Sequence, residues 1–259
     1  MMDALIKPLI RESKDNPVYM ALVITGALSL LFLLLPTLDL WVSNLFFSET
    51  DGFWAKQSWF FQRLRRMGIL WPRLIILGLL LFLVARLFAP QLRKLISIAH
   101  ALILILTVLL GTGLLVNLVL KDHWGRARPI QTDVFGGQWP FSEVWLIAGN
   151  CEKNCSFVSG EGSMSFWLFG LLFLVPLAWR KVSFWIILIF ASLFSLNRIA
   201  FGGHYLSDIL LSWSLTALVM ALLYHLFSDK SPLGWTPERL ETAWDRAGAW
   251  LCSKWVPPS

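Results

Sequence analysis

The stretch "ISIAHALILILTVLLGTGLLVNLVL", residues 96–120, decides the fold class of this chain. It contains no Asp, Glu, Lys or Arg over 25 residues, and about 20 apolar residues are enough for an α-helix to cross the hydrocarbon layer of a bilayer. Runs of this length are rare in soluble domains. The stretch therefore predicts a transmembrane helix.

Similar apolar runs recur along the rest of the 259 residues. The chain is 57% hydrophobic and 15% charged, with a mean hydropathy of +0.66, which excludes an ordinary soluble domain. Its 15 Trp fit a membrane protein, because Trp gathers at membrane–water interfaces. We predict an all-α polytopic membrane protein with about six transmembrane helices, in a domain covering residues 1–228. The predicted segments are 18–36, 69–89, 96–120, 163–179, 183–197 and 206–227.

Two polar regions are expected at the membrane surface. Residues 41–66 mix Phe and Trp with charged residues, which suits a helix or loop in the interface. The cytoplasmic tail, 229–259, carries an amphipathic pattern that predicts a short surface helix, with a loosely ordered tail as the alternative. The first apolar segment is too long for the core of a cleavable signal peptide, so we expect it to be retained.

Basic residues in short loops predict the orientation of the chain. One set falls on a single side, which we assign to the cytoplasm together with both termini: Lys7, Arg11, Lys14, Arg93, Lys94, Arg180 and Lys181. The opposite side carries a second set: Arg63, Arg65, Arg66, Lys121, Arg126 and Arg128. This second set breaks the usual charge rule, and we interpret it as the sign of a bound anion. The net charge of +6 fits anionic lipid headgroups and gives no reason to expect nucleic acid.

Cysteine positions agree with this orientation. Cys151 and Cys155 fall on the non-cytoplasmic side, where an oxidising compartment would allow a disulfide between them. A metal-binding pair is the alternative, although no further Cys or His lies nearby in the sequence to complete a site. Cys252 falls in the predicted cytoplasmic tail and is expected to be a free thiol.

Three short motifs carry candidate chemistry. The first, "KDHWGRARP" from residue 121, brings Lys121, Arg126 and Arg128 together just after a transmembrane segment. Clustered cations repel one another unless they share an anion, and guanidinium groups suit phosphate oxygens. A basic anchor at the membrane edge is the alternative interpretation.

The second motif, "CSFVSGEGS" at residues 155–163, resembles a loop that enters a helix. Backbone N–H groups at a helix N-terminus favour an anion, Ser159 adds a hydroxyl and Gly160 allows close approach. An ordinary helix start with Ser159 as the cap is the alternative interpretation.

The third motif, "NRIAFGGHYLSD" at residues 197–208, places His204 and Asp208 one helical turn apart. A carboxylate bound to one imidazole nitrogen fixes the tautomer and leaves the other nitrogen as a nucleophile or base. Arg198 lies six residues before His204. A structural polar pair at a helix end is the alternative.

The predicted topology places all three motifs at one membrane face, where they would form a phosphate site with a built-in nucleophile. His204 would attack phosphorus and Asp208 would stabilise the imidazolium, while the other groups neutralise the equatorial oxygens. The predicted phosphate ligands are Lys121, Arg128, Arg198, Ser159 and Gly160. The cations supply the necessary positive charge, so we expect neither a metal ion nor another cofactor.

The motifs resemble those of the type 2 phosphatidic acid phosphatase superfamily, whose signature is KxxxxxxRP, PSGH and SRxxxxxHxxxD. The resemblance covers about residues 18–227, with Asn197 in place of Ser in the third motif. It implies a metal-independent phosphatase of the acid-phosphatase type, which acts on a lipid-linked phosphate through a phosphohistidine at His204. It also implies a bacterial inner membrane, with the active site facing the periplasm.

The middle motif departs from the family because Glu161 replaces its His. The family His is thought to protonate the leaving group, so we expect Glu161 to be the general acid, with His123 as the fallback. Loss of catalysis is the alternative outcome. The form with SGE is similar to a branch grouped with lipid A phosphatases.

The implied substrates are lipid A, undecaprenyl pyrophosphate, phosphatidylglycerol phosphate and phosphatidate. The extra cations Arg63, Arg65, Arg66 and Arg126 would suit a lipid with more than one phosphate. A phosphotransferase that passes the group to a second lipid, and a non-catalytic protein that binds anionic lipid, are the alternatives. We expect the bilayer and the lipid substrate as partners and see no sign of an obligate protein partner.

Overall fold

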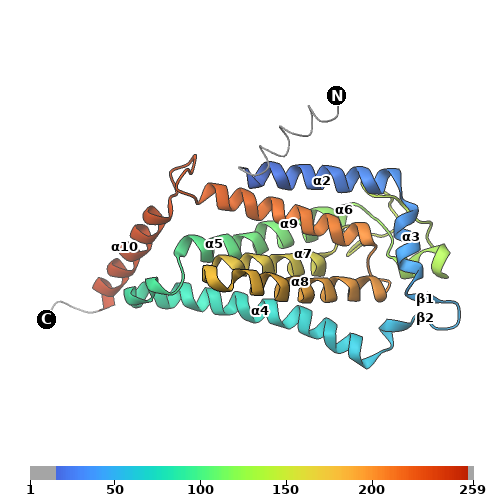
Figure 1. Ribbon diagram of the computed structural model, residues 1–259, viewed down its shortest axis with the longest axis horizontal. Coiled ribbons are helices and arrows are strands. Elements are labelled where there is room, and N and C mark those ends of the chain that lie inside the picture. Colours follow the sequence, from blue (N-terminus) through green and yellow to red (C-terminus); the bar gives the residue numbers. More distant parts are fainter. Residues whose placement is uncertain (1–15, 256–259) are drawn as a thin grey trace.

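The computed structural model describes residues 16–255, so the predicted cytoplasmic cations Lys7, Arg11 and Lys14 lie outside the described residues. Long helices run side by side as a bundle (Figure 1). They are α2 (Pro17–Leu34), α4 (Trp59–Phe88), α5 (Ile98–Leu106), α8 (Leu177–Ala200) and α9 (Leu206–Leu226). The α5 helix continues through the π-type segment η3 (Thr107–Leu120) into the short α6 (Lys121–His123).

Five helices of the described chain are long and apolar enough to cross a membrane, which corrects the expectation of about six. The fourth predicted segment, 163–179, is instead α7 (Gly160–Trp167) followed by the 3₁₀ helix η6 (Leu168–Phe173). Together they extend about 24 Å, short of the roughly 30 Å of a hydrocarbon core. Because α7 begins at the fully buried Ser159 and packs against η3, α8 and α9, it does not need to cover the full thickness.

The predicted interfacial stretch, 41–66, is a series of short elements that ends in a transmembrane helix. It contains the end of α3 (Thr37–Asn44), the antiparallel strands β1 (Phe47–Ser48) and β2 (Gly52–Phe53), and the 3₁₀ helix η1 (Trp54–Lys56). The α4 helix begins at Trp59, ten residues before the predicted start. Its first turns are polar and aromatic, and so escape a hydropathy search.

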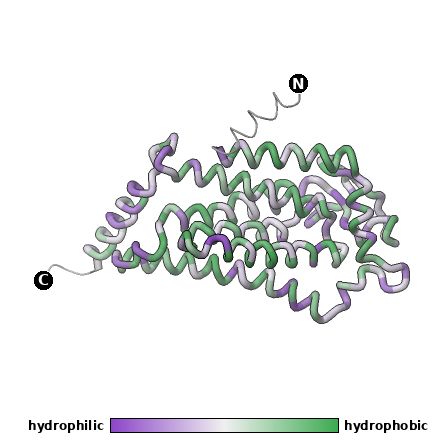
Figure 2. Tube along the Cα trace, in the orientation of Figure 1, coloured by the Kyte–Doolittle hydropathy of each residue, from purple (hydrophilic) through white to green (hydrophobic). Residues whose placement is uncertain are grey.

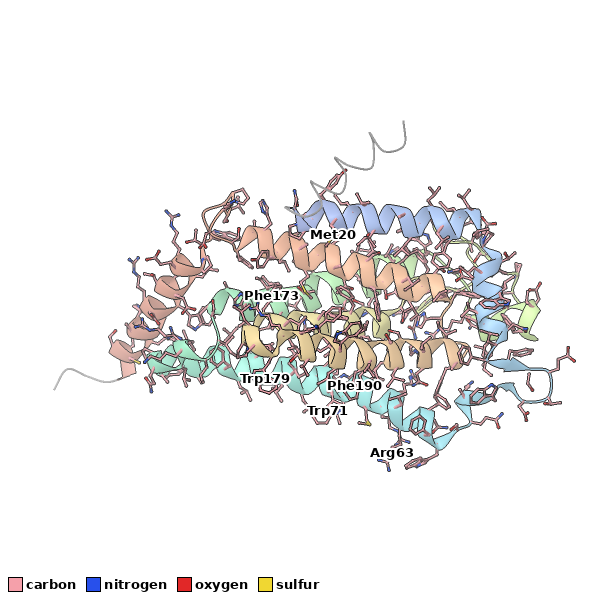
Figure 3. All side chains as sticks on the ribbon, in the orientation of Figure 1. Met20, Arg63, Trp71, Phe173, Trp179 and Phe190 are labelled. Carbon is pink, nitrogen blue, oxygen red and sulfur yellow. A yellow bond between two sulfur atoms is a disulfide. The ribbon has the colours of Figure 1, made fainter. Side chains whose placement is uncertain are left out.

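The outer face of the bundle is apolar, as a lipid-facing surface requires (Figure 2). Large side chains such as Met20, Trp71 and Phe190 point outward and are about half exposed (Figure 3). Inside the bundle, small polar groups join the helices. Ser163 of α7 hydrogen-bonds to Thr112 of η3 and to Thr216 of α9, each at 2.7 Å. Such contacts hold membrane helices together where no hydrophobic force between helices operates.

The tail forms the helix α10 (Pro237–Trp255), which packs against α4 and α5. Its Glu241 and Asp245 accept hydrogen bonds from the fully buried guanidinium of Arg86, at 3.0 and 2.6 Å. Trp244 donates its indole N–H to the carbonyl of Leu83 at 3.1 Å. These contacts hold the amphipathic helix on the end of the bundle.

The two ends of the bundle carry different elements (Figure 1). At one end lie α3, the β1–β2 hairpin and the starts of α7 and α9, together with the loop between α6 and α7. At the other end lie α10, the 3₁₀ helix η2 (Pro90–Lys94) and the start of α8. The η2 helix contains Arg93, and the start of α8 contains Arg180. The loop between α6 and α7 includes the short 3₁₀ helices η4 (Pro129–Gln131) and η5 (Asp133–Phe135).

Candidate active site

His204 lies in the turn between α8 and α9 and is almost completely buried. Its Nδ1 is 2.8 Å from the carbonyl oxygen of Ser156. Because a carbonyl can only accept, Nδ1 carries the hydrogen and Nε2 keeps its lone pair. The expected tautomer is therefore present, but the group that fixes it is a backbone carbonyl that the sequence does not reveal.

The protonation state of His204 also suits a nucleophile. Burial lowers the pKa of the imidazole to about 4, although the nearby Asp208 acts in the opposite direction. The positive charges of Arg198 and Lys121 lower this pKa further. The imidazole is therefore neutral at neutral pH.

Asp208 lies in the first turn of α9, beneath His204. Its Oδ2 is 3.8 Å from His204 Nδ1, beyond hydrogen-bond distance, which corrects the expected direct bond. This oxygen instead accepts from the hydroxyl of Ser156 and, at 2.9 Å, from the N–H of Tyr205. Asp208 therefore offers a fixed negative charge next to the imidazole.

Arg126 is fully buried and joins Asp208 to a second carboxylate. Its Nη1 donates to Asp208 at 2.7 Å and its Nη2 donates to Asp39 at 2.9 Å. Its Nε donates to the carbonyl of Ser142 at 2.9 Å. Burial raises the pKa of Asp39, and the charge of Arg126 opposes that rise. Arg126 is thus enclosed by protein groups, which corrects the expectation that it could contact a substrate phosphate.

Asp39 is not among the residues predicted from the sequence. One signal could have identified it: a single acidic residue in the apolar stretch "PTLDLW", residues 36–41, directly after the first transmembrane segment. Ionisable residues in such positions are costly unless they are paired.

The three predicted phosphate cations lie on different elements at the site end of the bundle. Lys121 begins α6 and is half-buried, and Arg198 is buried in the last turn of α8. Arg128 is half-buried, and its Nη2 donates to the carbonyl of Asn154 at 2.8 Å. Burial lowers the pKa of Arg128, and the nearby Arg65 lowers it further. Positive charge is therefore concentrated at this position.

Glu161, in the first turn of α7, lies between two guanidinium groups. Its Oε1 accepts from Nε and Nη2 of Arg65 at 3.3 and 3.2 Å. The same oxygen lies 3.2 Å from Nε of Arg198. This contact is an ion pair without a hydrogen bond, because the Nε–H of Arg198 does not point at the oxygen. Arg65 comes from α4, so the carboxylate joins the start of that helix to the predicted phosphate site.

The start of α7 is shaped as a helix N-terminus that opens on a cavity. The hydroxyl of Ser159 accepts from the N–H of Gly162 at 3.0 Å, which is the capping role. A Cβ on Gly160 would lie 2.5 Å from the side-chain oxygen of Asn117, so a larger residue would require the Asn117 side chain to move. A cavity of about 250 Å³ is lined by Asn117, Lys121, Gly160 and Glu161, among others.

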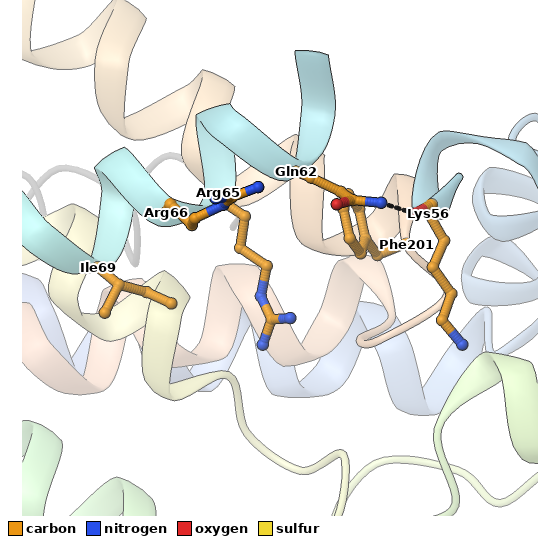
Figure 4. Close-up of a pocket in the computed structure, with 6 residues that line it drawn as sticks. All are labelled: Lys56, Gln62, Arg65, Arg66, Ile69 and Phe201. Carbon is orange, nitrogen blue, oxygen red and sulfur yellow. Dashed lines mark hydrogen bonds between the residues drawn. The ribbon is translucent and has the colours of Figure 1, made fainter. Parts of the chain in front are cut away.

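A second cavity, of about 420 Å³, lies beside the first, and Ile69 lines both. It is formed by the end of η1, the first turns of α4 and the end of α8 (Figure 4). Its lining residues are Lys56, Gln62, Arg65, Arg66, Ile69 and Phe201. Arg63 lies outside this set, with its guanidinium over the ring of Trp59.

The remaining predicted residues have more peripheral positions. His123 is exposed, and its Nδ1 lies 3.0 Å from the carbonyls of Leu118 and Val119, so its described contacts are with the preceding helix. Cys151 and Cys155 form a disulfide with their Cα atoms 5.7 Å apart. Among residues 16–255, no cluster of three or more His, Cys, Asp or Glu has metal-binding geometry.

The disulfide segment is attached to the first motif. The N–H of Cys155 donates to the carbonyl of Lys121 at 3.1 Å, and the N–H of Ser156 donates to the carbonyl of Arg126 at 2.8 Å. Ser156 in turn contacts both His204 and Asp208. The disulfide therefore closes the loop that orients the imidazole.

Comparison with known proteins gives a consistent result. Residues 99–232 match the PAP2 superfamily. The chain is similar to the lipid A 4'-phosphatase of Rhizobium etli, with 37% identity over 219 residues, or 77% of this chain and 83% of that protein. It is also similar to the lipid A 4'-phosphatase of Francisella tularensis subsp. novicida, with 32% identity over 80% of this chain and 96% of that protein. The lipid A 4'-phosphatase of Rhizobium leguminosarum is 49% identical over 46% of this chain and 52% of that protein. No solved structure matches the chain significantly.

Proposed function

Because the chain belongs to the PAP2 superfamily and is a membrane lipid phosphatase, we propose that it removes the 4'-phosphate of lipid A through a phosphohistidine at His204. The observation that carries the mechanism is the hydrogen bond from His204 Nδ1 to Ser156, which leaves Nε2 as a free nucleophile. Three lipid A 4'-phosphatases among the relatives support the substrate.

In the first step, the lone pair of His204 Nε2 attacks phosphorus in line with the leaving oxygen. A P–N bond forms and the P–O bond to the lipid sugar breaks. Asp208, 3.8 Å from Nδ1, stabilises the positive charge that develops on the ring. The charge on the equatorial oxygens is neutralised by Lys121, Arg128 and Arg198, with the hydroxyl of Ser159 and the N–H of Gly160.

Glu161 supplies the proton for the leaving oxygen in this proposal. In the structure its carboxylate is paired with Arg65 and Arg198. An arriving phosphate competes with this carboxylate for Arg198, which frees Glu161 to face the leaving oxygen. The protonated Glu161 then acts as the general acid.

In the second step, water attacks the phosphorus of the phosphohistidine. The P–N bond breaks, its electron pair returns to Nε2 of His204, and the proton from water passes to the Glu161 carboxylate. Inorganic phosphate leaves, and the neutral imidazole is restored. A phosphotransferase would use a lipid hydroxyl in place of this water.

The test is phosphate release by the purified protein in detergent from four lipids: lipid A, undecaprenyl pyrophosphate, phosphatidylglycerol phosphate and phosphatidate. We expect lipid A to be the preferred substrate, with the loss located at the 4' position by mass spectrometry. His204→Gln should abolish release, while the matched variant His123→Gln, at an exposed histidine, should retain it. Release of phosphate from one of the other lipids but not from lipid A would show that lipid A is not the substrate. Equal release of phosphate with and without an acceptor lipid would exclude the phosphotransferase.

We also propose that the site faces the periplasm of a bacterial inner membrane, with both termini in the cytoplasm. Arg93 and Arg180 lie at the end of the bundle opposite the site, and the disulfide lies at the site end (Figure 1). The free Cys252 provides the test. A membrane-impermeant thiol reagent should label it only after spheroplasts are lysed, and labelling of intact spheroplasts would contradict the orientation.

A further inference from the structure

The cavity at the start of α4, called here the α4 pocket, lies next to the proposed phosphate site, and one of its lining residues, Arg65, pairs with Glu161. It is defined by Lys56, Gln62, Arg65, Arg66, Ile69 and Phe201. Its volume is about 420 Å³. A space of this size is large enough for a headgroup fragment.

The α4 pocket has an excess of positive charge. Lys56, Arg65 and Arg66 line it, and of these Arg65 is paired with Glu161. Within residues 16–255, no carboxylate lies within 4.0 Å of the charged groups of Lys56 or Arg66. Like charges around one cavity raise its free energy unless an anion is shared between them. The chemistry of the α4 pocket therefore calls for an anionic ligand.

One neutral polar group of the α4 pocket suits a hydroxyl. The side chains of Lys56 and Arg65 extend in the same direction from η1 and α4 (Figure 4). The ring of Phe201 is buried, and the guanidinium groups of Arg65 and Arg198 lie over it at 5.9 and 5.8 Å. Gln62, whose amide N–H donates to the carbonyl of Lys56 at 3.0 Å, keeps its side-chain oxygen as an acceptor for a hydroxyl.

The α4 pocket is connected to the reaction site through shared residues. Ile69 lines both cavities, and Arg65 reaches from the α4 pocket to Glu161, which also contacts Arg198. Phe201 lies three residues before His204 in the same turn. A ligand whose phosphate meets His204 can therefore extend directly into the α4 pocket.

We infer that the α4 pocket binds a second anionic group on the sugar headgroup of the same lipid, so that the enzyme selects headgroups phosphorylated at two positions. The inference rests on the proposed function, because it concerns a further part of the same substrate. Lys56 and Arg66 are the selective groups, since each is an exposed cation without a carboxylate partner in the described chain.

The test compares two substrates, lipid A with both phosphates and lipid A that retains the 4'-phosphate alone. Wild type should prefer the first. The double variant Lys56→Ala/Arg66→Ala should lose about tenfold in kcat/KM on the two-phosphate lipid, mainly through KM, as expected for loss of a charged contact. Its activity on the single-phosphate lipid should be unchanged, which also shows that it is folded. The matched control is Arg63→Ala, which removes a cation of the same helix that lies outside the pocket.

Two results would overturn the inference: an equal loss on both lipids, which indicates general attraction of anions, or no loss on either. A third result would also overturn it: a preference for the two-phosphate lipid that appears only when phosphatidylglycerol is added to neutral micelles. That result would show that the pocket binds a neighbouring lipid instead. Failure of the proposed function looks different, because wild type would then release phosphate from another lipid and from neither form of lipid A.

Discussion

The motif "RARP" contains two arginines, Arg126 and Arg128. Replacement of Arg126 should mainly reduce the stability of the protein, whereas replacement of Arg128 should mainly reduce its activity. Arg126→Met removes a fully buried cation that bonds to Asp208 at 2.7 Å and to Asp39 at 2.9 Å. Two buried carboxylates then lose their shared partner. Removal of one partner from a buried ion pair costs about 3–5 kcal/mol. We expect the free energy of unfolding to fall by at least this amount.

The same reasoning predicts how the destabilisation of Arg126→Met depends on pH. A buried carboxylate without a cation takes up a proton in the folded variant, while the same group is ionised in the unfolded chain above about pH 4. The folded state then binds more protons, so stability falls as pH rises, by about 1.4 kcal/mol per pH unit for each such group. The loss should therefore be larger at pH 8 than at pH 6.

Arg128→Met is the matched control, because Arg128 is half-buried and bonds to a single carbonyl, that of Asn154. It should change stability by no more than about 1 kcal/mol, yet lower kcat by about 100- to 1,000-fold, as loss of a donor to developing charge does. Unfolding by SDS in mixed micelles and phosphate release measure the two effects. Equal stabilities of the two variants, or a pH-independent loss in Arg126→Met, would refute the buried network.

Three further predictions concern the reaction site. Burial lowers the pKa of His204 to about 4, so its imidazole stays unprotonated above that pH. A plot of log kcat/KM against pH should therefore show no decrease on the acid side near pH 6.5. A decrease there would indicate that a solvated histidine takes part in the mechanism. Glu161→Gln should lower kcat/KM, which reports formation of the phosphohistidine, about 100-fold on lipid A but much less on p-nitrophenyl phosphate, whose leaving group needs no proton; equal losses in kcat/KM would exclude a general acid. Cys151→Ser/Cys155→Ser should lower the free energy of unfolding by about 2 kcal/mol, the value for a short closed loop, and reduce activity, while Cys252→Ser changes neither; an unaffected double variant would show that the loop is held without its disulfide.

The positions of the three motifs in the fold could be predicted from the sequence, because the spacing within each motif is local. His204 and Asp208 are one helical turn apart, and each motif lies at the end of an apolar segment, so the topology alone brings Lys121, Arg198 and His204 to one end of the bundle. The transmembrane segments were recognisable because a long apolar run leaves few alternatives in a bilayer.

The parts that escaped prediction depend on contacts between distant residues. The carbonyl of Ser156 fixes the tautomer of His204, and a backbone acceptor has no signature in the sequence. Arg126 appeared to be one more phosphate cation, because its partner Asp39 lies 87 residues away. The α7 helix was expected to span the bilayer, but hydropathy does not report that its first residues begin inside the protein.

The central claim is that His204 carries the phosphoryl group, and covalent trapping tests it most directly. The protein would be mixed with lipid A labelled in its 4'-phosphate, quenched rapidly in alkaline SDS, and digested to locate the label by mass spectrometry. The label should lie on His204, be stable in alkali and labile in acid, and disappear together with phosphate release in His204→Gln. Phosphate release that persists in His204→Gln, or a label on another residue, would contradict the account.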